Sequence, residues 1–220
     1  MSAAAETPEV VSPVSADSFD SEPVATPRLL GLLSFWAHTA FILAYVGILS
    51  TAMFYYQFAQ GEFPCPLCIA QRMAMMIVTL GPLYIVVRAL RGQSTLATLA
   101  TGSGIAILGA VLGMAMSSRQ VLLHIAPGDP GYGTAVLGMH LYTWALVTFV
   151  VVLVFCGVVL ALGRWVVPLA PQGTVLRTVV WIVIGLLLFT IAINAVVVFI
   201  ESGWNWYLPD NPTEYRLFAG

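Results

Sequence analysis

The sequence has no lysine, and charged residues make up only 8% of its 220 residues. The eight basic residues are all arginines and occur singly, so the chain offers no basic patch for nucleic acid. Hydrophobic residues make up 60% of the chain, whereas a soluble domain carries about 25% charged residues. A surface with so little charge must face lipid, and the composition therefore predicts a membrane protein.

Cysteine is also scarce, and the chain has only three: Cys65, Cys68 and Cys156. So small and odd a number does not fit the disulfide framework of a secreted protein, whereas a reactive pair with one residue left over does fit. Cys156 lies beside Val154 and Phe155 in an apolar stretch, where a thiol behaves as a small buried hydrophobe. We therefore assign a role only to the pair.

Five apolar stretches are long enough to cross a membrane as helices. They cover residues 29–58, 69–87, 96–116, 141–162 and 179–200. The fold class that this pattern predicts is all-α, a polytopic bundle of membrane helices. Residues 1–27 carry acidic residues among prolines, serines and alanines, and we expect a disordered cytoplasmic tail there.

The arginines predict the orientation of the helices, because cytoplasmic loops of membrane proteins carry an excess of basic residues. Five of them flank one side of the apolar stretches: Arg28, Arg88, Arg91, Arg164 and Arg177. The opposite side has Arg72, Arg119 and Arg216. We expect the N-terminus to be cytoplasmic, and the C-terminus to lie outside together with the cysteine pair. In a bacterium that outer side is the oxidising periplasm.

The pair lies in the run Pro64-Cys65-Pro66-Leu67-Cys68, directly before the second apolar stretch. Proline suits the first turn of a helix, so Cys68 should lie near a helix start, where the helix dipole and free N–H groups stabilise an anion. Arg72 follows four residues later on the same face. It is expected to stabilise the Cys68 thiolate or to donate hydrogen bonds to an acceptor resting on it. Redox chemistry is favoured over a purely structural disulfide, because closing so short a loop adds little stability.

A second interpretation is a copper or zinc site, with Cys65, Cys68, His124 and His140 as ligands on the outer side. The spacing of the histidines matches no finger-like pattern of zinc ligands, so redox chemistry remains the stronger interpretation. His38 lies inside the first apolar stretch, where a hydrogen-bonded packing role is at least as well supported as a functional one.

With Arg72 four residues after the pair, this run at the start of the second membrane helix resembles the bacterial DsbB family of quinone-linked disulfide-forming enzymes. The similarity covers residues 29–162, which the resemblance implies form a DsbB-like four-helix core. In that family an outer Cys-x-x-Cys pair passes electrons to a bound quinone. The resemblance implies that Cys68 contacts the quinone ring, that Arg72 hydrogen-bonds to it and that Cys65 is the disulfide partner of Cys68.

Further residues align with the quinone pocket of that family: Arg119, His124 and Trp144. The cofactor implied by the resemblance is a quinone, either ubiquinone or menaquinone. The partner implied is a periplasmic thioredoxin-like thiol protein or another thiol substrate. The location implied is the bacterial inner membrane.

The chain departs from the usual plan of that family in two respects. Typical members have a second cysteine pair between the third and fourth helices, whereas residues 117–140 contain no cysteine and are expected to begin with a short interfacial helix. A fifth apolar stretch follows the four-helix core. We expect a tail at 1–27, a DsbB-like transmembrane domain at 28–165, a connection and fifth transmembrane helix at 166–200, and a periplasmic tail at 201–220.

The expected function is therefore that of a membrane thiol-disulfide oxidoreductase which passes electrons from a thiol through the cysteine pair to a quinone. The alternative is a non-catalytic assembly or scaffold subunit, whose function would survive replacement of either cysteine. Without a second pair, a partner thiolate must attack the Cys65–Cys68 disulfide directly. We expect the attack on Cys65, because it precedes the helix and should be less buried than Cys68.

Overall fold

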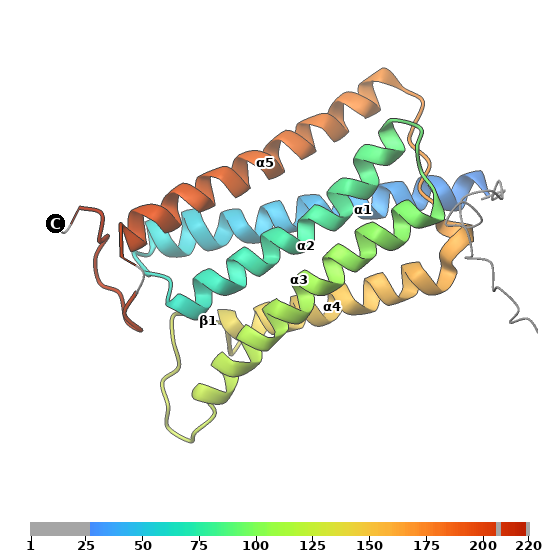
Figure 1. The fold of residues 1–220 in the computed structure, drawn as a ribbon. Helices are drawn as coiled ribbons and strands as arrows, with labels where there is room; N and C mark the ends of the chain where they lie inside the picture. The colour runs from blue at the N-terminus through green and yellow to red at the C-terminus, as the bar shows by residue number, and fades with distance from the viewer. Residues whose placement is uncertain (1–26, 206–207, 219–220) are drawn as a thin grey trace, which may run out of the picture.

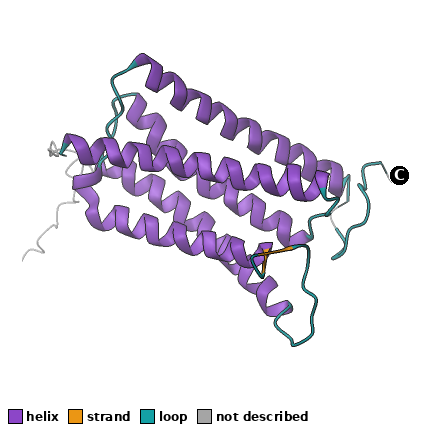
Figure 2. Cartoon of the chain, turned by 180° about the vertical axis from the view of Figure 1, so that it is seen from behind, coloured by secondary structure: helices purple, strands orange, loops and turns teal. Residues whose placement is uncertain are grey.

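The computed structural model describes residues 27–205 and 208–218, which form a bundle of five long helices (Figure 1). The helices are α1 (Arg28–Ser50), α2 (Pro66–Leu90), α3 (Leu96–Leu123), α4 (Leu141–Leu162) and α5 (Thr174–Ser202). The π-helical segment η2 (Thr51–Ala59) continues α1, and the short 3-10 helix η3 (Gly163–Val166) follows α4. Two short strands, β1 (Ala135–Val136) and β2 (Met139–His140), pair antiparallel before α4 (Figure 2). The prediction of an all-α bundle is confirmed.

Each of the five helices is long and apolar enough to cross a membrane, as the sequence predicts. The main difference is at the end of α3, which continues to Leu123, whereas the sequence predicts an end near Met116 and a separate surface helix. Ser117 and Gln120 are buried on this extension, so packing against the bundle keeps it part of one helix. The predicted disordered tail falls, except for Pro27, on residues outside the described part of the chain.

Small residues bring α2, α3 and α4 close together, as expected for helices packed in a membrane. A side chain at Gly81 of α2 would collide with the carbonyl oxygen of Gly102 of α3. Gly113 of α3 likewise leaves room for the ring of Phe149 of α4. Gly104, by contrast, faces open space, since a Cβ there would meet nothing within 4 Å.

The fifth helix lies against α1 and the far part of α2. One buried cluster joins Phe35 and Ile42 of α1, Val86 of α2, and Val183 and Leu187 of α5. Figure 1 shows α5 alongside α1 at one edge of the bundle. This added helix is therefore packed on the four-helix core.

The helices alternate in direction, so α1 begins at one end of the bundle and α5 finishes at the other (Figure 1). The end where α1 begins carries the five arginines predicted to be cytoplasmic, and the Arg177 guanidinium donates to the carbonyl oxygen of Leu90 there (2.6 Å). The opposite end holds the start of α2, residues 124–140 and the described C-terminal segment. Which end faces the cytoplasm stays a prediction.

Candidate functional site

The cysteine pair forms the first turn of α2. Cys65 is the N-cap residue, Pro66 opens the helix, and the backbone N–H of Cys68 donates to the Cys65 sulfur (3.2 Å). Proline fits this position because the first N–H groups of a helix have no partner within it. The sequence-based placement of Cys68 at a helix start is therefore confirmed.

A glutamine from α3 connects the two sulfurs. The Gln120 side-chain amide donates to Cys65 Sγ (3.3 Å) and lies 3.6 Å from Cys68 Sγ. Its carbonyl oxygen accepts from the Gln71 amide of α2 (2.8 Å), which directs the Gln120 amide group toward the sulfurs. N–H donors of this kind favour the anionic form of a thiol.

The Arg72 side chain is held by the π-helical segment. Its Nη1 donates to Gln57 Oε1 (2.6 Å) and its Nη2 donates to the carbonyl oxygen of Ala52 (2.9 Å). π-Helical turns occur frequently at functional sites. Arg72 is only 9% exposed, and among the described residues no carboxylate forms a direct ion pair with it.

Cys68, and not Cys65, is the more exposed residue of the pair. Cys65 is 6% exposed, whereas Cys68 is partly exposed and lines a cavity, so the expectation that Cys65 is the less buried of the two is wrong. Both thiols are unlinked here, and hydrogen bonding with Cys68 together with burial raises the pKa of the Cys65 thiol. The segment of residues 124–140 is fastened beside Cys65 by the Tyr132 hydroxyl, which donates to the carbonyl oxygen of Phe63 (2.6 Å).

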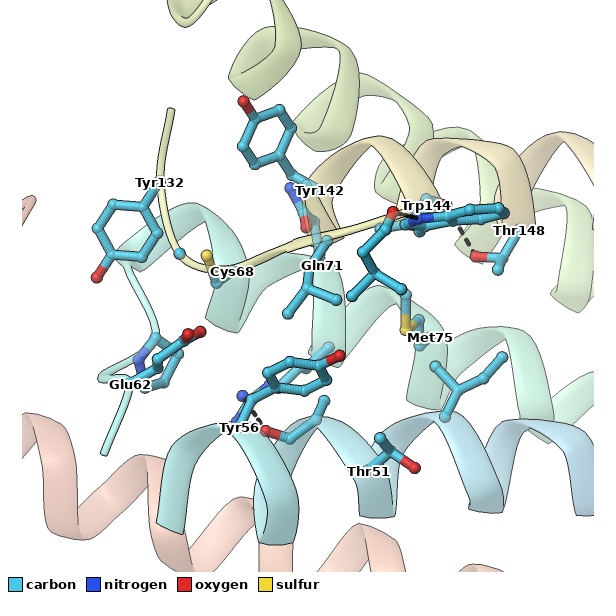
Figure 3. A pocket seen from close by; sticks show the side chains of 18 of the residues that line it. Thr51, Tyr56, Glu62, Cys68, Gln71, Met75, Tyr132, Tyr142, Trp144 and Thr148 are labelled. Atoms are coloured by element: carbon cyan, nitrogen blue, oxygen red, sulfur yellow. Dashed lines mark hydrogen bonds between the residues drawn. The ribbon is translucent and has the colours of Figure 1, made fainter. Parts of the chain in front are cut away.

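The cavity beside Cys68 has a volume of about 600 Å³ and lies between α1, η2, α2 and α4. Its aromatic and long apolar lining includes Ile48, Tyr56, Phe63, Met75, Tyr132, Tyr142 and Trp144. Arg72, Gln71 and Glu62 add polar groups to the wall. Figure 3 shows Cys68 at this cavity, with Tyr132, Tyr142, Tyr56 and Trp144 disposed around it. An apolar cleft with a few hydrogen-bonding groups is typical of a site for a small, largely apolar ligand.

The three further residues predicted for the quinone pocket differ in their position relative to the cavity. Trp144 lines the cavity, and its indole nitrogen donates to the carbonyl oxygen of Val136 (2.9 Å). His124 does not line the cavity, but its ring stacks on Tyr142, which does (centroids 5.6 Å apart). Arg119 is exposed and is not brought to the cavity. Cys68 and Arg72 both line it.

The two histidines of the alternative metal site interact with residues other than the two cysteines. His124 pairs with Asp129 (3.0 Å), and the rings of His124 and His140 both stack on Tyr142. Throughout the described part of the chain, no three His, Cys, Asp or Glu side chains converge in a way that could hold a metal ion. The geometry gives the metal interpretation no support.

Three glutamines of the site were not predicted from the sequence: Gln57, Gln71 and Gln120. Gln71 had a detectable signal, since it lies three residues after Cys68 on a helix and therefore on a neighbouring face. Gln120 sits next to Arg119, and only the packing of α3 on α2 shows that the amide points inward. Gln57 and Gln71 are polar residues inside apolar stretches, where burial without a partner is unfavourable.

The fold and the site together define a polytopic helical membrane protein with a Cys-x-x-Cys pair beside an apolar cavity. The family profile described as Disulfide bond formation protein DsbB matches residues 34–134. The chain is also similar to Disulfide bond formation protein B of Methylococcus capsulatus (strain ATCC 33009 / NCIMB 11132 / Bath), with 35% identity over 96 residues. Residues 34–134 of the chain are thus similar to the DsbB family.

The match to this relative covers 42% of the present chain and 56% of the relative. The family profile includes the cysteine pair and Arg72 and ends before α4 and α5. No solved structure matches the chain at a significant level.

Proposed function

We propose that the chain is a membrane thiol-disulfide oxidoreductase that passes electrons from a thiol through the Cys65–Cys68 pair to a membrane quinone. One observation carries the proposal: Cys68 and the buried Arg72 line the same largely apolar cavity at the start of α2. Cys68 would contact the quinone ring and Arg72 would hydrogen-bond to it.

The cavity fits a quinone in both size and chemistry. Its volume of about 600 Å³ is typical of small-molecule sites, and its aromatic lining suits a flat, apolar ring. Arg72, Gln71 and the tyrosines offer donors for carbonyl oxygens. When bound, the quinone, a ubiquinone or a menaquinone, supplies a two-electron, two-proton acceptor.

The residues of the chain have separable tasks in this reaction. The helix start and the Gln120 amide stabilise negative charge on Cys68, while the Cys65 thiol is held beside it. Oxidation of the two thiols forms one S–S bond and releases two protons and two electrons, which the acceptor takes up. Arg72 contributes fixed N–H donors and positive charge at the cavity wall.

The thiol donor would be a periplasmic thioredoxin-like protein or another thiol substrate. Because residues 117–140 contain no cysteine, the donor must exchange directly with the Cys65–Cys68 disulfide. Access to the buried Cys65 would require the outer segment around Tyr132 to move. This assignment also places the protein in the bacterial inner membrane, with a cytoplasmic N-terminus, a periplasmic C-terminus and the domain boundaries expected from the sequence.

The test is an assay of purified protein with dithiothreitol as thiol donor and a short-chain ubiquinone analogue as acceptor. Quinol formation is expected to match loss of donor dithiol one to one and to exceed the rate without protein. A scaffold or assembly subunit would leave the uncatalysed rate unchanged, and that result would exclude the proposal in favour of the alternative.

Replacing Gln120 with alanine is expected to slow this turnover about tenfold, because a hydrogen bond to a charged group contributes roughly 1.5 kcal/mol. The matched control is Arg119→Ala at the neighbouring, exposed position, which should keep the wild-type rate. Equal losses in the two variants would show a general disturbance of α3, and an unchanged rate in Gln120→Ala would remove the amide from the mechanism.

A further inference from the structure

The fifth helix carries a buried acid at the same end of the bundle as the cysteine pair. Glu201 lies one residue before the end of α5 and is 0% exposed. Its position falls outside residues 34–134, which match the DsbB family. A carboxyl group is rarely buried so completely unless it has a partner.

Glu201 is joined to Arg72 through one side chain. Its Oε2 accepts from the Gln57 amide nitrogen (3.4 Å), and Gln57 Oε1 accepts from Arg72 Nη1 (2.6 Å). A glutamine amide has one donating and one accepting end. The guanidinium only donates and the carboxylate only accepts, so the two ends favour the same orientation of the Gln57 amide.

Charge points to the same pairing. A buried guanidinium needs compensation, and Arg72 is only 9% exposed. The acid that lines the cavity, Glu62, is engaged instead by the hydroxyl and the backbone N–H of Thr134. Among the described residues, Glu201 is thus the acid connected to Arg72 through hydrogen bonds, and its second oxygen, Oε1, has no hydrogen-bond partner there.

The backbone around Glu201 is fixed by the C-terminal segment. The N–H of Arg216 donates to the carbonyl oxygen of Glu201 (3.2 Å), and the N–H of Leu217 donates to that of Ile200 (3.1 Å). These bonds satisfy carbonyl groups that the end of a helix leaves without partners. The ring of Tyr215 then packs against Phe63, two residues before Cys65 (centroids 5.0 Å apart). The end of α5 is thereby held against the segment that carries the cysteine pair.

We propose that Glu201 is a positioning residue for the quinone site, and that it acts through Gln57 to fix the Arg72 guanidinium at the cavity wall. The fifth helix then belongs to the site, although it lies outside the part of the chain that matches the family. This inference rests on the proposed function, since it assumes that Arg72 donates to a quinone.

The test is calorimetric titration of the purified protein with a short-chain ubiquinone analogue. Glu201→Ala is expected to raise the dissociation constant about tenfold, the effect of losing one hydrogen bond to a charged group. Glu201→Gln should bind more tightly than Glu201→Ala but less tightly than the wild type, because its amide oxygen still accepts from Gln57 whereas the charge is lost. The matched control is Asn194→Ala, which alters another buried polar residue of α5 whose amide bonds within the helix to Thr190.

An unchanged dissociation constant in Glu201→Ala would overturn the inference. So would a Glu201→Gln variant as weak as Glu201→Ala, because the hydrogen bond through Gln57 would then have no effect. Adding Glu201→Ala to Arg72→Ala should cause no further loss, and additive losses would contradict action through Arg72. Should Glu201→Ala fail to fold, Gln57→Leu removes the side chain that links Arg72 to Glu201 by hydrogen bonds. It must then raise the dissociation constant similarly.

The two levels of the proposal fail in different ways. A wild-type protein that neither binds nor reduces quinone would refute the proposed function itself. A wild-type protein that does both, with Glu201→Ala and Gln57→Leu binding equally well, would refute only the role of Glu201.

Discussion

Replacing Cys68 with serine is expected to reduce thiol-dependent quinone reduction at least about a thousandfold, to the uncatalysed rate, because removing the reacting nucleophile of an enzyme has effects of this size or larger. Cys68 lines the cavity, and its partner Cys65 is the buried N-cap residue of α2. A serine oxygen at position 68 cannot form the disulfide. The measurement is the steady-state rate of quinol formation, monitored by absorbance.

Cys156 supplies the matched control for this variant. It is 3% exposed in the core between the helices and does not line the cavity. Cys156→Ser should therefore retain turnover, even if the polar hydroxyl lowers the stability of the bundle. If Cys68→Ser kept substantial activity while Cys156→Ser lost it, the assignment of the reactive pair would be wrong.

Replacing Arg72 with alanine is expected to weaken quinone binding roughly 10- to 100-fold, since hydrogen bonds to charged groups contribute about 1.5–3 kcal/mol. The variant would also leave the acceptors at Gln57 and Ala52 without their donor, so unfolding temperature must be measured in parallel. Arg72→Lys should restore binding only in part, because an ammonium group lacks the planar fork that reaches both acceptors.

Arg91→Ala is the control for loss of positive charge, because Arg91 is exposed and caps the far end of α2. It should bind quinone as the wild type does. An Arg72→Ala protein that folds and keeps wild-type affinity would make Arg72 a structural residue of the helix start.

The sequence was sufficient for the fold and for the centre of the site. Apolar stretches of membrane length predict the five helices, and Pro66 predicts the helix start that the structure shows at Cys65. The spacing from Cys68 to Arg72 predicts that both lie on one face, and both do line one cavity. These features depend on local periodicity, which sequence displays directly.

The second layer of the site depends on contacts between distant helices, and local periodicity does not encode these. Gln57, Gln120 and Glu201 come from three different elements, and only packing brings Gln120 to the cysteine pair and connects Gln57 and Glu201 to Arg72. The π-helical form of residues 51–59 likewise has no simple residue pattern. Cys65 was expected to be less buried than Cys68 because it precedes a membrane helix, but neighbouring segments bury it.

The most direct test of the central claim is a single turnover without oxygen. Fully reduced Cys156→Ala protein is mixed with excess quinone, and both quinol and remaining free thiols are counted. The expected result is one quinol per chain, with the loss of both thiols and a peptide map showing Cys65 linked to Cys68. Quinol formed while both thiols remain free to alkylation, or a disulfide that never forms under excess quinone, would contradict electron transfer from this pair to a quinone.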